Sequence, residues 1–106
     1  MTLRTSLTVA AGLVLVTACA SSKPGPQNTH PYVGMWVTKD GHIRQELRPD
    51  GRYDEARGER RSAYTGSYTV HGSHIEYRDD TGFTADGDFA DLNTLHHGGY
   101  VFYRER

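Results

Sequence analysis

The chain has 106 residues, of which 36% are hydrophobic and 24% are charged. At this length we expect one small domain with a small core. The 12 Lys and Arg against 13 Asp and Glu give a formal net charge of −1. This balance excludes nucleic acid as a partner held by a basic surface. The single cysteine excludes an internal disulfide framework.

The first nineteen residues resemble the export signal of a lipoprotein. Arg4 supplies one positive charge, residues 7–16 are apolar or small almost throughout, and Cys19 follows small residues. The apolar stretch is too short to span a membrane. The pattern predicts that residues 1–18 are removed as a signal peptide and that Cys19 becomes a lipidated N-terminus. An ordinary signal peptide with an unmodified cysteine is the alternative.

The segment after the cysteine is polar, contains Pro and Gly, and shows no periodicity. We interpret residues 19–30 as the lipidated cysteine and a flexible tether, and residues 31–106 as the folded domain. The predicted location is the cell envelope, with the N-terminal lipid anchoring the chain to a membrane. Ala20 stands where an Asp would favour the inner membrane, so the outer membrane facing the periplasm is favoured.

The remaining sequence consists of short alternating runs rich in Tyr, Val, Phe, Ile and Thr, with no apolar residues at helical spacing. Turns that contain Gly separate the runs, as in consecutive β-hairpins. We predict an all-β fold, an eight-stranded antiparallel up-and-down barrel, because closure removes exposed strand edges. The predicted strands cover residues 32–38, 43–48, 52–58, 63–71, 74–79, 83–89, 92–97 and 99–105.

Four tight turns predict how the strands pair. They are a DG turn at 40–41, a PDG loop at 49–51, a GS turn at 72–73 and a GG turn at 98–99. A slip of one residue would move the apolar side chains to the wrong face. The predicted cross-strand pairs are Gly34–Leu47, Trp36–Gln45, Leu47–Tyr53, Gln45–Glu55, Ile43–Arg57, Val70–Ile75, Tyr68–Tyr77, Leu95–Phe102, His97–Tyr100 and Asn93–Arg104.

This register places both apolar and polar side chains on the inner face of the barrel. The polar ones are Gln45, Glu55, Arg57, Asp79 and His97. A filled core disfavours such groups, because an unpaired buried charge costs several kcal/mol. We therefore predict a ligand-sized pocket, with a mouth-side Glu55–Arg57 ion pair as the alternative. The apolar inner residues are predicted to be Trp36, Ile43, Leu47, Tyr53, Tyr64, Tyr68, Val70, Ile75, Tyr77, Phe83, Phe89, Leu95 and Phe102.

Four segments carry a resemblance to a known family. They are YVGMWV at 32–37, DGHIR at 40–44, RYDEARG at 52–58 and DDTGFTADGDF at 79–89. They resemble a small bacterial family of unknown function, first described from an Agrobacterium member. The resemblance implies a streptavidin-like eight-stranded barrel and a suspected ligand pocket. It implies no particular ligand, activity or cofactor.

The Gly-x-Trp opening of Gly34 and Trp36 is shared with streptavidin-like and lipocalin-like barrels. In such barrels an Arg near the chain end often lies across the Trp face. The resemblance therefore implies a structural cation–π contact of Arg104 with Trp36.

Metal and catalytic sites receive little support from the sequence. The acidic residues of 79–91 lack the ligand order of an EF-hand, and are better interpreted as turn-forming and solvated. The His71–His74 pair and the His96-His97 dipeptide do not offer three ligands in one shell. We expect no metal, no cofactor and no catalytic residues. A Glu55 base with a His97 acid is the weak enzymatic alternative.

The leading hypothesis is a binding module that captures a small, unidentified molecule. Under this hypothesis replacing Glu55 by Gln weakens binding. The alternative is a loop-mediated interaction module, such as an inhibitor of an envelope hydrolase or an assembly factor, using residues 57–61 or 79–82. A homo-oligomer stays open. The predicted ligand-binding residues are Gln45, Tyr53, Glu55, Arg57, Tyr68, Tyr77, Asp79, His97 and Tyr100.

Overall fold

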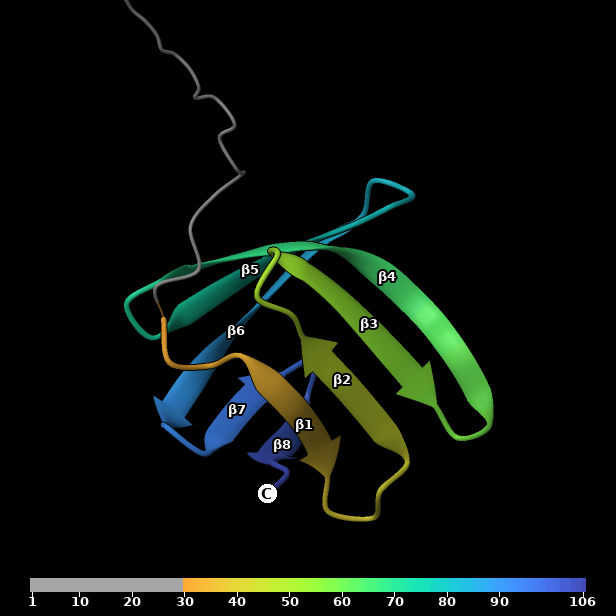
Figure 1. The fold of residues 1–106 in the computed structure, drawn as a ribbon, viewed down its shortest axis with the longest axis horizontal. Helices are drawn as coiled ribbons and strands as arrows, with labels where there is room; N and C mark the ends of the chain where they lie inside the picture. The colour runs from red at the N-terminus through yellow and green to blue at the C-terminus, as the bar shows by residue number, and fades with distance from the viewer. Residues whose placement is uncertain (1–29) are drawn as a thin grey trace, which may run out of the picture.

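A computed structural model describes residues 30–106 of the chain. Each strand pairs antiparallel with the next, and the last pairs with the first to close the barrel (Figure 1). This confirms the predicted fold class. The strands are β1 (Gly34–Thr38), β2 (Ile43–Leu47), β3 (Arg52–Arg57), β4 (Arg60–His71), β5 (His74–Asp79), β6 (Thr84–Asp91), β7 (Thr94–His97) and β8 (Tyr100–Arg104).

The predictions for Cys19, the signal peptide and most of the tether fall on residues 1–29, outside the described part of the chain. Within residues 30–106 there is no helix long and apolar enough to cross a membrane.

The cross-strand pairs follow the register that the turns predict. Trp36 pairs with Gln45, Gln45 with Glu55, and Tyr68 with Tyr77. The remaining predicted pairs across β1–β2, β2–β3, β4–β5 and β7–β8 are also present, and the Arg104 amide donates to the Asn93 carbonyl at 3.0 Å. Short turns therefore determine which side chains share the inner face.

Among the strand starts that differ from the prediction, those of β4 and β7 lie beside an irregular ladder. β4 begins at Arg60 rather than at residue 63. A register shift between Glu55 and Arg57 and a positive φ of 49° at Ser62 lengthen this hairpin. β7 begins at Thr94 rather than at residue 92, since a shift between Phe89 and Asp91 moves the turn. A β-bulge of this kind inserts one residue, which alternation alone cannot reveal.

The prediction that Phe83 faces the interior is wrong. β6 begins one residue later than expected, at Thr84, and Phe83 lies in the β5–β6 turn with 78% of its surface exposed. This turn, drawn in cyan, extends away from the barrel body in Figure 1. Alternation applies only within a strand, so it does not fix the direction of a turn residue.

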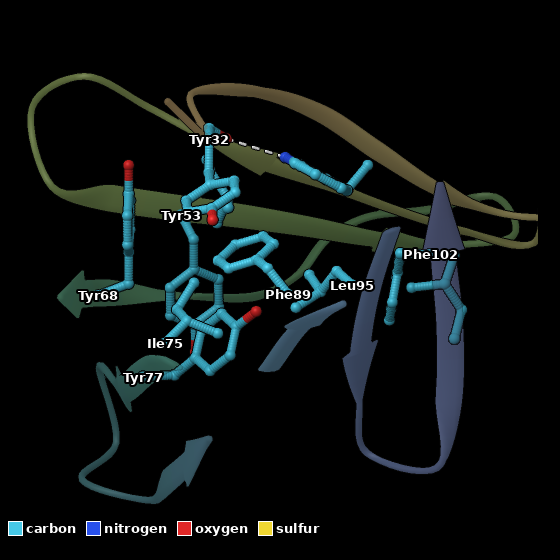
Figure 2. Packing of buried hydrophobic residues seen from close by; sticks show 11 residues of the cluster. Tyr32, Tyr53, Tyr68, Ile75, Tyr77, Phe89, Leu95 and Phe102 are labelled. Atoms are coloured by element: carbon cyan, nitrogen blue, oxygen red, sulfur yellow. Dashed lines mark hydrogen bonds between the residues drawn. The ribbon is translucent and has the colours of Figure 1, made fainter. Parts of the chain in front are cut away.

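The core fills the barrel with rings and branched chains from all eight strands and from Tyr32 (Figure 2). Trp36 is fully buried, and its Nε1 donates to the Tyr32 carbonyl at 2.9 Å, the dashed bond of Figure 2. Tyr32 stacks on Phe89 with ring centroids 3.6 Å apart and planes nearly parallel. We call the end of the barrel around Tyr32, Trp36, Phe89 and Arg104 the closed end.

Arg104 holds the closed end together. Its guanidinium carbon lies 4.6 Å from the Trp36 ring centroid, the contact that the resemblance implied. Nε and both Nη atoms donate to the carbonyls of Pro31, Val33 and Leu92 at 2.6–3.1 Å. Gly34 permits this approach, because its φ is +146° and a Cβ there would lie 3.2 Å from Arg104 Nη1.

The last residue of the predicted tether packs against the barrel. The His30 ring lies edge-on to Tyr68, with centroids 5.5 Å apart, and its Nδ1 accepts from the Tyr32 amide at 3.0 Å. The Tyr68 hydroxyl donates to the Arg48 carbonyl at 2.7 Å, so the His30 Nε2, 3.1 Å away, donates to Tyr68. Residue 30 thus belongs structurally to the closed end.

Candidate functional site

A pocket of about 480 Å³ opens at the opposite end of the barrel, which we call the mouth. The β3–β4 and β5–β6 turns border it, and five of its lining residues carry rings. Its volume lies in the range of about 300–1,000 Å³ that small-molecule sites occupy. The lining residues are Tyr53, Glu55, Arg57, Ala63, Tyr64, Tyr77, Asp79, Thr81, Phe83, Thr84, Ala85 and His97.

A chain of hydrogen bonds leads from the core to the mouth. The Tyr77 hydroxyl donates to Gln45 Oε1 at 2.7 Å, and Gln45 Nε2 donates to Glu55 Oε1 at 2.8 Å. Arg57 Nε donates to Glu55 Oε2 at 2.9 Å. Each carboxylate oxygen of Glu55 therefore accepts a hydrogen bond, and these bonds offset the cost of removing the carboxylate from water. The ion pair that the sequence left as an alternative is present, and a pocket lies beside it.

Arg57 lies at the rim between two tyrosine rings. Its guanidinium carbon is 5.2 Å from the Tyr64 centroid and 5.6 Å from the Tyr100 centroid. Tyr64 lies in phase with the buried Gly66 and Tyr68 of β4, but it is 44% exposed because it stands at the rim. Such cation–π contacts hold the guanidinium head in place while its outer face stays open to solvent.

His97 forms one side of the pocket. Its ring packs on Tyr77 with centroids 4.4 Å apart, and its Nδ1 lies 3.0 Å from the Asp86 carbonyl. A carbonyl oxygen only accepts, so Nδ1 must donate in this bond. The neutral ring then carries its lone pair on Nε2.

Tyr53 and Asp79 complete the polar lining. Tyr53 packs edge-on against Tyr77 at 5.1 Å between centroids (Figure 2) and is only 7% exposed. Its hydroxyl has no hydrogen-bond partner among residues 30–106, the described part of the chain. Burial, followed by the charges of Asp79 and Glu55, raises the pKa of Tyr53 to about 12, so the phenol stays protonated. Asp79 Oδ1 caps the β5–β6 turn by accepting from the Thr81 amide and hydroxyl.

Six of the nine predicted ligand-binding residues line this pocket, and three do not. Gln45 is fully buried behind Glu55, with both ends of its amide engaged. Tyr68 lies beside the β2–β3 turn, where its hydroxyl bonds Arg48 and His30, and Figure 2 shows it far from Phe102. Tyr100 is 45% exposed and lies against Arg57 outside the lining. Alternation assigns a face but not a depth along the barrel axis, so it could not separate these residues.

Six lining residues were not among the predicted ligand-binding residues, and all lie on the β4 and β5–β6 side of the mouth. They are Ala63, Thr81, Thr84 and Ala85, together with Tyr64 and Phe83, which were expected only as inner-face residues. One signal could have found them. In an up-and-down barrel alternate turns lie at the same end, so the β3–β4 and β5–β6 turns had to flank Arg57.

A larger hollow of about 640 Å³ lies on the outer face of β4, β5 and β6. The side chains that project there are exposed and polar, such as Thr69, Glu76 and Asp86. None of them is a buried polar group that needs a partner. We therefore place the candidate site at the mouth, where buried polar atoms meet aromatic walls.

The geometry gives little support to catalysis by Glu55 and His97. The two oxygens of Glu55 accept from Gln45 and Arg57, and no hydrogen bond joins Glu55 to His97 within residues 30–106. A catalytic acid and base act within hydrogen-bond reach of the protons that they transfer. In the same residues no three His, Cys, Asp or Glu side chains gather closely enough to hold a metal ion.

Fold and site together define a small, closed eight-stranded up-and-down barrel with an aromatic pocket at one end. The chain belongs to the family described as Agrobacterium tumefaciens protein Atu4866, whose model matches residues 29–104. The function of this family is unknown. The solution structure of the protein Atu4866 from Agrobacterium tumefaciens is 73% identical to the matched region, with a TM-score of 0.67. The match covers 73% of this chain and 98% of that chain. No functionally curated protein matches the chain.

Proposed function

We propose that this protein is an envelope lipoprotein whose barrel binds a small molecule at its mouth. The observation that carries the proposal is the Tyr53 side chain, which lines the mouth pocket, is only 7% exposed, and has a hydroxyl without a protein partner among residues 30–106. A hydroxyl that loses its water and gains no hydrogen bond costs about 1–3 kcal/mol, so the pocket favours a ligand that can bond this group. A fold that served only for stability gains nothing from this group, whereas a ligand in the pocket gives it a partner.

The arrangement around Tyr53 supports the same function. The hydrogen-bond chain from Tyr77 to Arg57 fixes the pocket walls before any ligand arrives. Preorganised walls lower the entropic cost of binding. Glu55 serves this chain, so its replacement by Gln would disturb the walls as well as any ligand contact. A clean test therefore leaves Glu55 in place and fills the pocket from another position.

Native mass spectrometry of the protein purified from its own host tests the proposal. Ala85 also borders the outer hollow, but it lies opposite the inward-facing Tyr77 and shares its face, so Ala85→Trp directs the new ring into the mouth pocket without removing a polar contact. Ala90→Trp is the matched control, because Ala90 is exposed near the other end of the same strand, outside the mouth lining. We expect a reproducible small-molecule adduct on the wild type and on Ala90→Trp, and its loss from Ala85→Trp.

Two outcomes would overturn binding at the mouth. One is a wild-type protein that carries no adduct in any preparation. The other is an adduct that Ala85→Trp retains while it stays folded by circular dichroism. The measured mass of a retained or lost adduct also gives the mass of the ligand.

The lipid anchor rests on the lipobox around Cys19. We expect metabolically supplied palmitate to label the wild type and the protein to enter the outer-membrane fraction. Cys19→Ser should remove the label and release the protein from that fraction. A Cys19→Ser variant that stays in the membrane fraction, or a wild type without label, would refute the anchor. The outer-membrane assignment alone fails if the labelled wild type enters the inner-membrane fraction.

A second candidate function is a loop-mediated interaction module. The exposure of Phe83 in the projecting β5–β6 turn favours it, since a large exposed ring at a rim is typical of an anchor for a partner. On this view Phe83→Ser, or Ser at both Arg60 and Arg61, abolishes capture of a partner while Ala85→Trp does not. The opposite pattern rejects it.

A further inference from the structure

The charges of the mouth pocket do not cancel. Glu55 is neutralised by Arg57 at 2.9 Å, but Asp79 forms no ion pair within residues 30–106. Asp79 Oδ1 accepts both bonds of the turn cap, and Oδ2 has no hydrogen-bond partner in the described chain. The pocket therefore presents one uncompensated carboxylate. This charge favours a cationic group over an anionic one.

The fixed directions of the hydrogen bonds add acceptors to the pocket. Gln45 Nε2 donates to Glu55, so its Oε1 faces Tyr77 and the Tyr77 hydroxyl must donate its proton there. The Tyr77 oxygen is left with lone pairs only. His97 donates through Nδ1 to the Asp86 carbonyl, which leaves a lone pair on Nε2 in the neutral ring. The Tyr53 hydroxyl, which has no partner in the part of the chain that the structure describes, can accept as well as donate.

The aromatic walls suit a cation with a flat apolar body. Tyr53, Tyr77, Tyr64 and Phe83 surround the pocket, and ring faces attract positive charge. The protein already uses this chemistry at the rim, where the Arg57 guanidinium lies 5.2 and 5.6 Å from two tyrosine centroids. An anionic ligand would instead meet the open oxygen of Asp79 and these lone pairs, and the charged donors within its reach would be limited to the Nη atoms of Arg57 at the rim.

We infer that the mouth selects a small organic ammonium ion, a protonated amine on an aromatic or planar body, with its nitrogen directed to Asp79 and Tyr53. This inference rests on the proposed binding function and names its ligand class. The ammonium hydrogens can donate to Asp79 Oδ2 and to the Tyr53 oxygen, neither of which accepts a hydrogen bond within residues 30–106. The planar body packs between the aromatic walls.

Three probes of similar size test the choice of charge. Benzylamine, benzyl alcohol and benzoate share one ring and differ in carrying a positive, a neutral and a negative group at neutral pH. Each is titrated into the isotopically labelled full chain and followed by NMR chemical shifts. We expect saturable shifts with benzylamine at millimolar concentration, centred on Tyr53, Asp79 and His97, weaker shifts with the alcohol and none at the mouth with benzoate.

A pair of carboxylate variants tests the assigned residue. Asp79→Asn keeps the oxygen that caps Thr81 but removes the charge, and should weaken benzylamine binding about tenfold or more, the effect of a charged hydrogen bond. Asp91→Asn is the matched control. Asp91 caps a turn in the same way, by accepting from the Asn93 amide at 2.9 Å, but lies near the closed end. We expect Asp91→Asn to bind benzylamine as the wild type does.

Several results would overturn the inference. One is that benzoate binds at the mouth as tightly as benzylamine does. Another is that benzylamine causes no saturable chemical-shift change. A third is that Asp79→Asn and Asp91→Asn affect benzylamine binding equally. Shifts centred on the outer acidic residues around His74 would also overturn it. None of these results removes the proposed function, which is judged by the host-derived adduct and its loss in Ala85→Trp. If the adduct is lost from Ala85→Trp but kept by Asp79→Asn, the mouth is a binding pocket for another class of ligand.

Discussion

The two ends of the barrel differ in how fully their polar side chains are hydrogen-bonded. At the closed end, Arg104 places every guanidinium nitrogen on a backbone carbonyl and lies 4.6 Å from the Trp36 centroid. At the mouth, Arg57 uses only Nε in a hydrogen bond within the described chain, and Tyr53, which lines the pocket, has a hydroxyl without a partner there. One arginine is fully engaged within the fold, whereas the other leaves donors open.

This difference separates stability from binding. A satisfied buried network holds one structure, because any change leaves a polar group unpaired. An unsatisfied group costs stability and persists where a ligand can satisfy it. The closed end is therefore expected to respond to substitution as a structural core. The mouth is expected to tolerate some changes without loss of stability.

The largest expected loss of stability comes from a substitution at the closed end. Arg104→Met removes the bonds to three backbone carbonyls and the cation over Trp36, and should lower the free energy of unfolding by about 3 kcal/mol. Urea denaturation measures this loss. Arg44→Met is the control, since Arg44 forms a bidentate pair with Glu105 on the exposed outer surface. Such a pair contributes about 0–1 kcal/mol. Equal losses in the two variants would contradict the distinct role of Arg104.

The next effect concerns the inner hydrogen-bond chain. Glu55→Gln presents an amide NH₂ to two donors, Gln45 Nε2 and Arg57 Nε, and can accept from only one of them with its oxygen. One bond must fail, so we expect a loss of about 2 kcal/mol in the free energy of unfolding. Glu46→Gln, on the exposed side of β2, should stay within about 0.5 kcal/mol of the wild type. A neutral Glu55→Gln would show that the chain contributes little to the walls.

A smaller change in stability is expected when the hydroxyl is removed from one tyrosine at each end of the barrel. Tyr53→Phe removes a hydroxyl that has no partner within residues 30–106, so stability should stay the same or rise by up to about 1 kcal/mol. Tyr68→Phe removes a hydroxyl bonded to Arg48 and His30 and should cost about 1 kcal/mol. Thermal unfolding of both variants gives the contrast. A destabilised Tyr53→Phe would mean that its hydroxyl is already satisfied in the folded protein.

The smallest effect is a pH dependence at the closed end. Burial, and then the charge of Arg104, lower the pKa of His30 below its usual 6.5. A histidine with a lowered folded pKa contributes stability above pH 6.5, and this contribution declines as the pH falls through the folded value. NMR titration of the His30 ring should show the lowered pKa. His30→Gln should lose that part of the acid sensitivity. A His30 pKa at or above 6.5 would refute the sign.

The sequence predicted the fold well because its signals are local. Two- and three-residue turns such as residues 40–41 and 49–51 determine the hairpin register, and the register determines which side chains face inward. The pairs Gln45–Glu55 and Tyr68–Tyr77 follow from this alone. The β-bulges beside Arg57 and Phe89 shift strand starts, and they leave no comparable mark in the sequence.

The candidate site was only partly predictable. Tyr53, Glu55 and Asp79 were expected on the inner face, and all three line the mouth. The same reasoning also selected Gln45, which lies behind Glu55, and Tyr68, which belongs to the closed end. Inward direction has a period of two along a strand, but depth along the barrel depends on strand tilt and closure.

The sequence by itself determined the number of strands, their order, their pairing and the side chains shared by one face, since contacts between neighbouring strands are set by short turns. Only the tertiary structure decided which polar groups satisfy one another and which stay open. That outcome depends on distances across the barrel, such as the 2.7 Å from the Tyr77 hydroxyl on β5 to Gln45 on β2. Strands far apart in sequence meet there, and hydrogen bonds tolerate only a few tenths of an ångström.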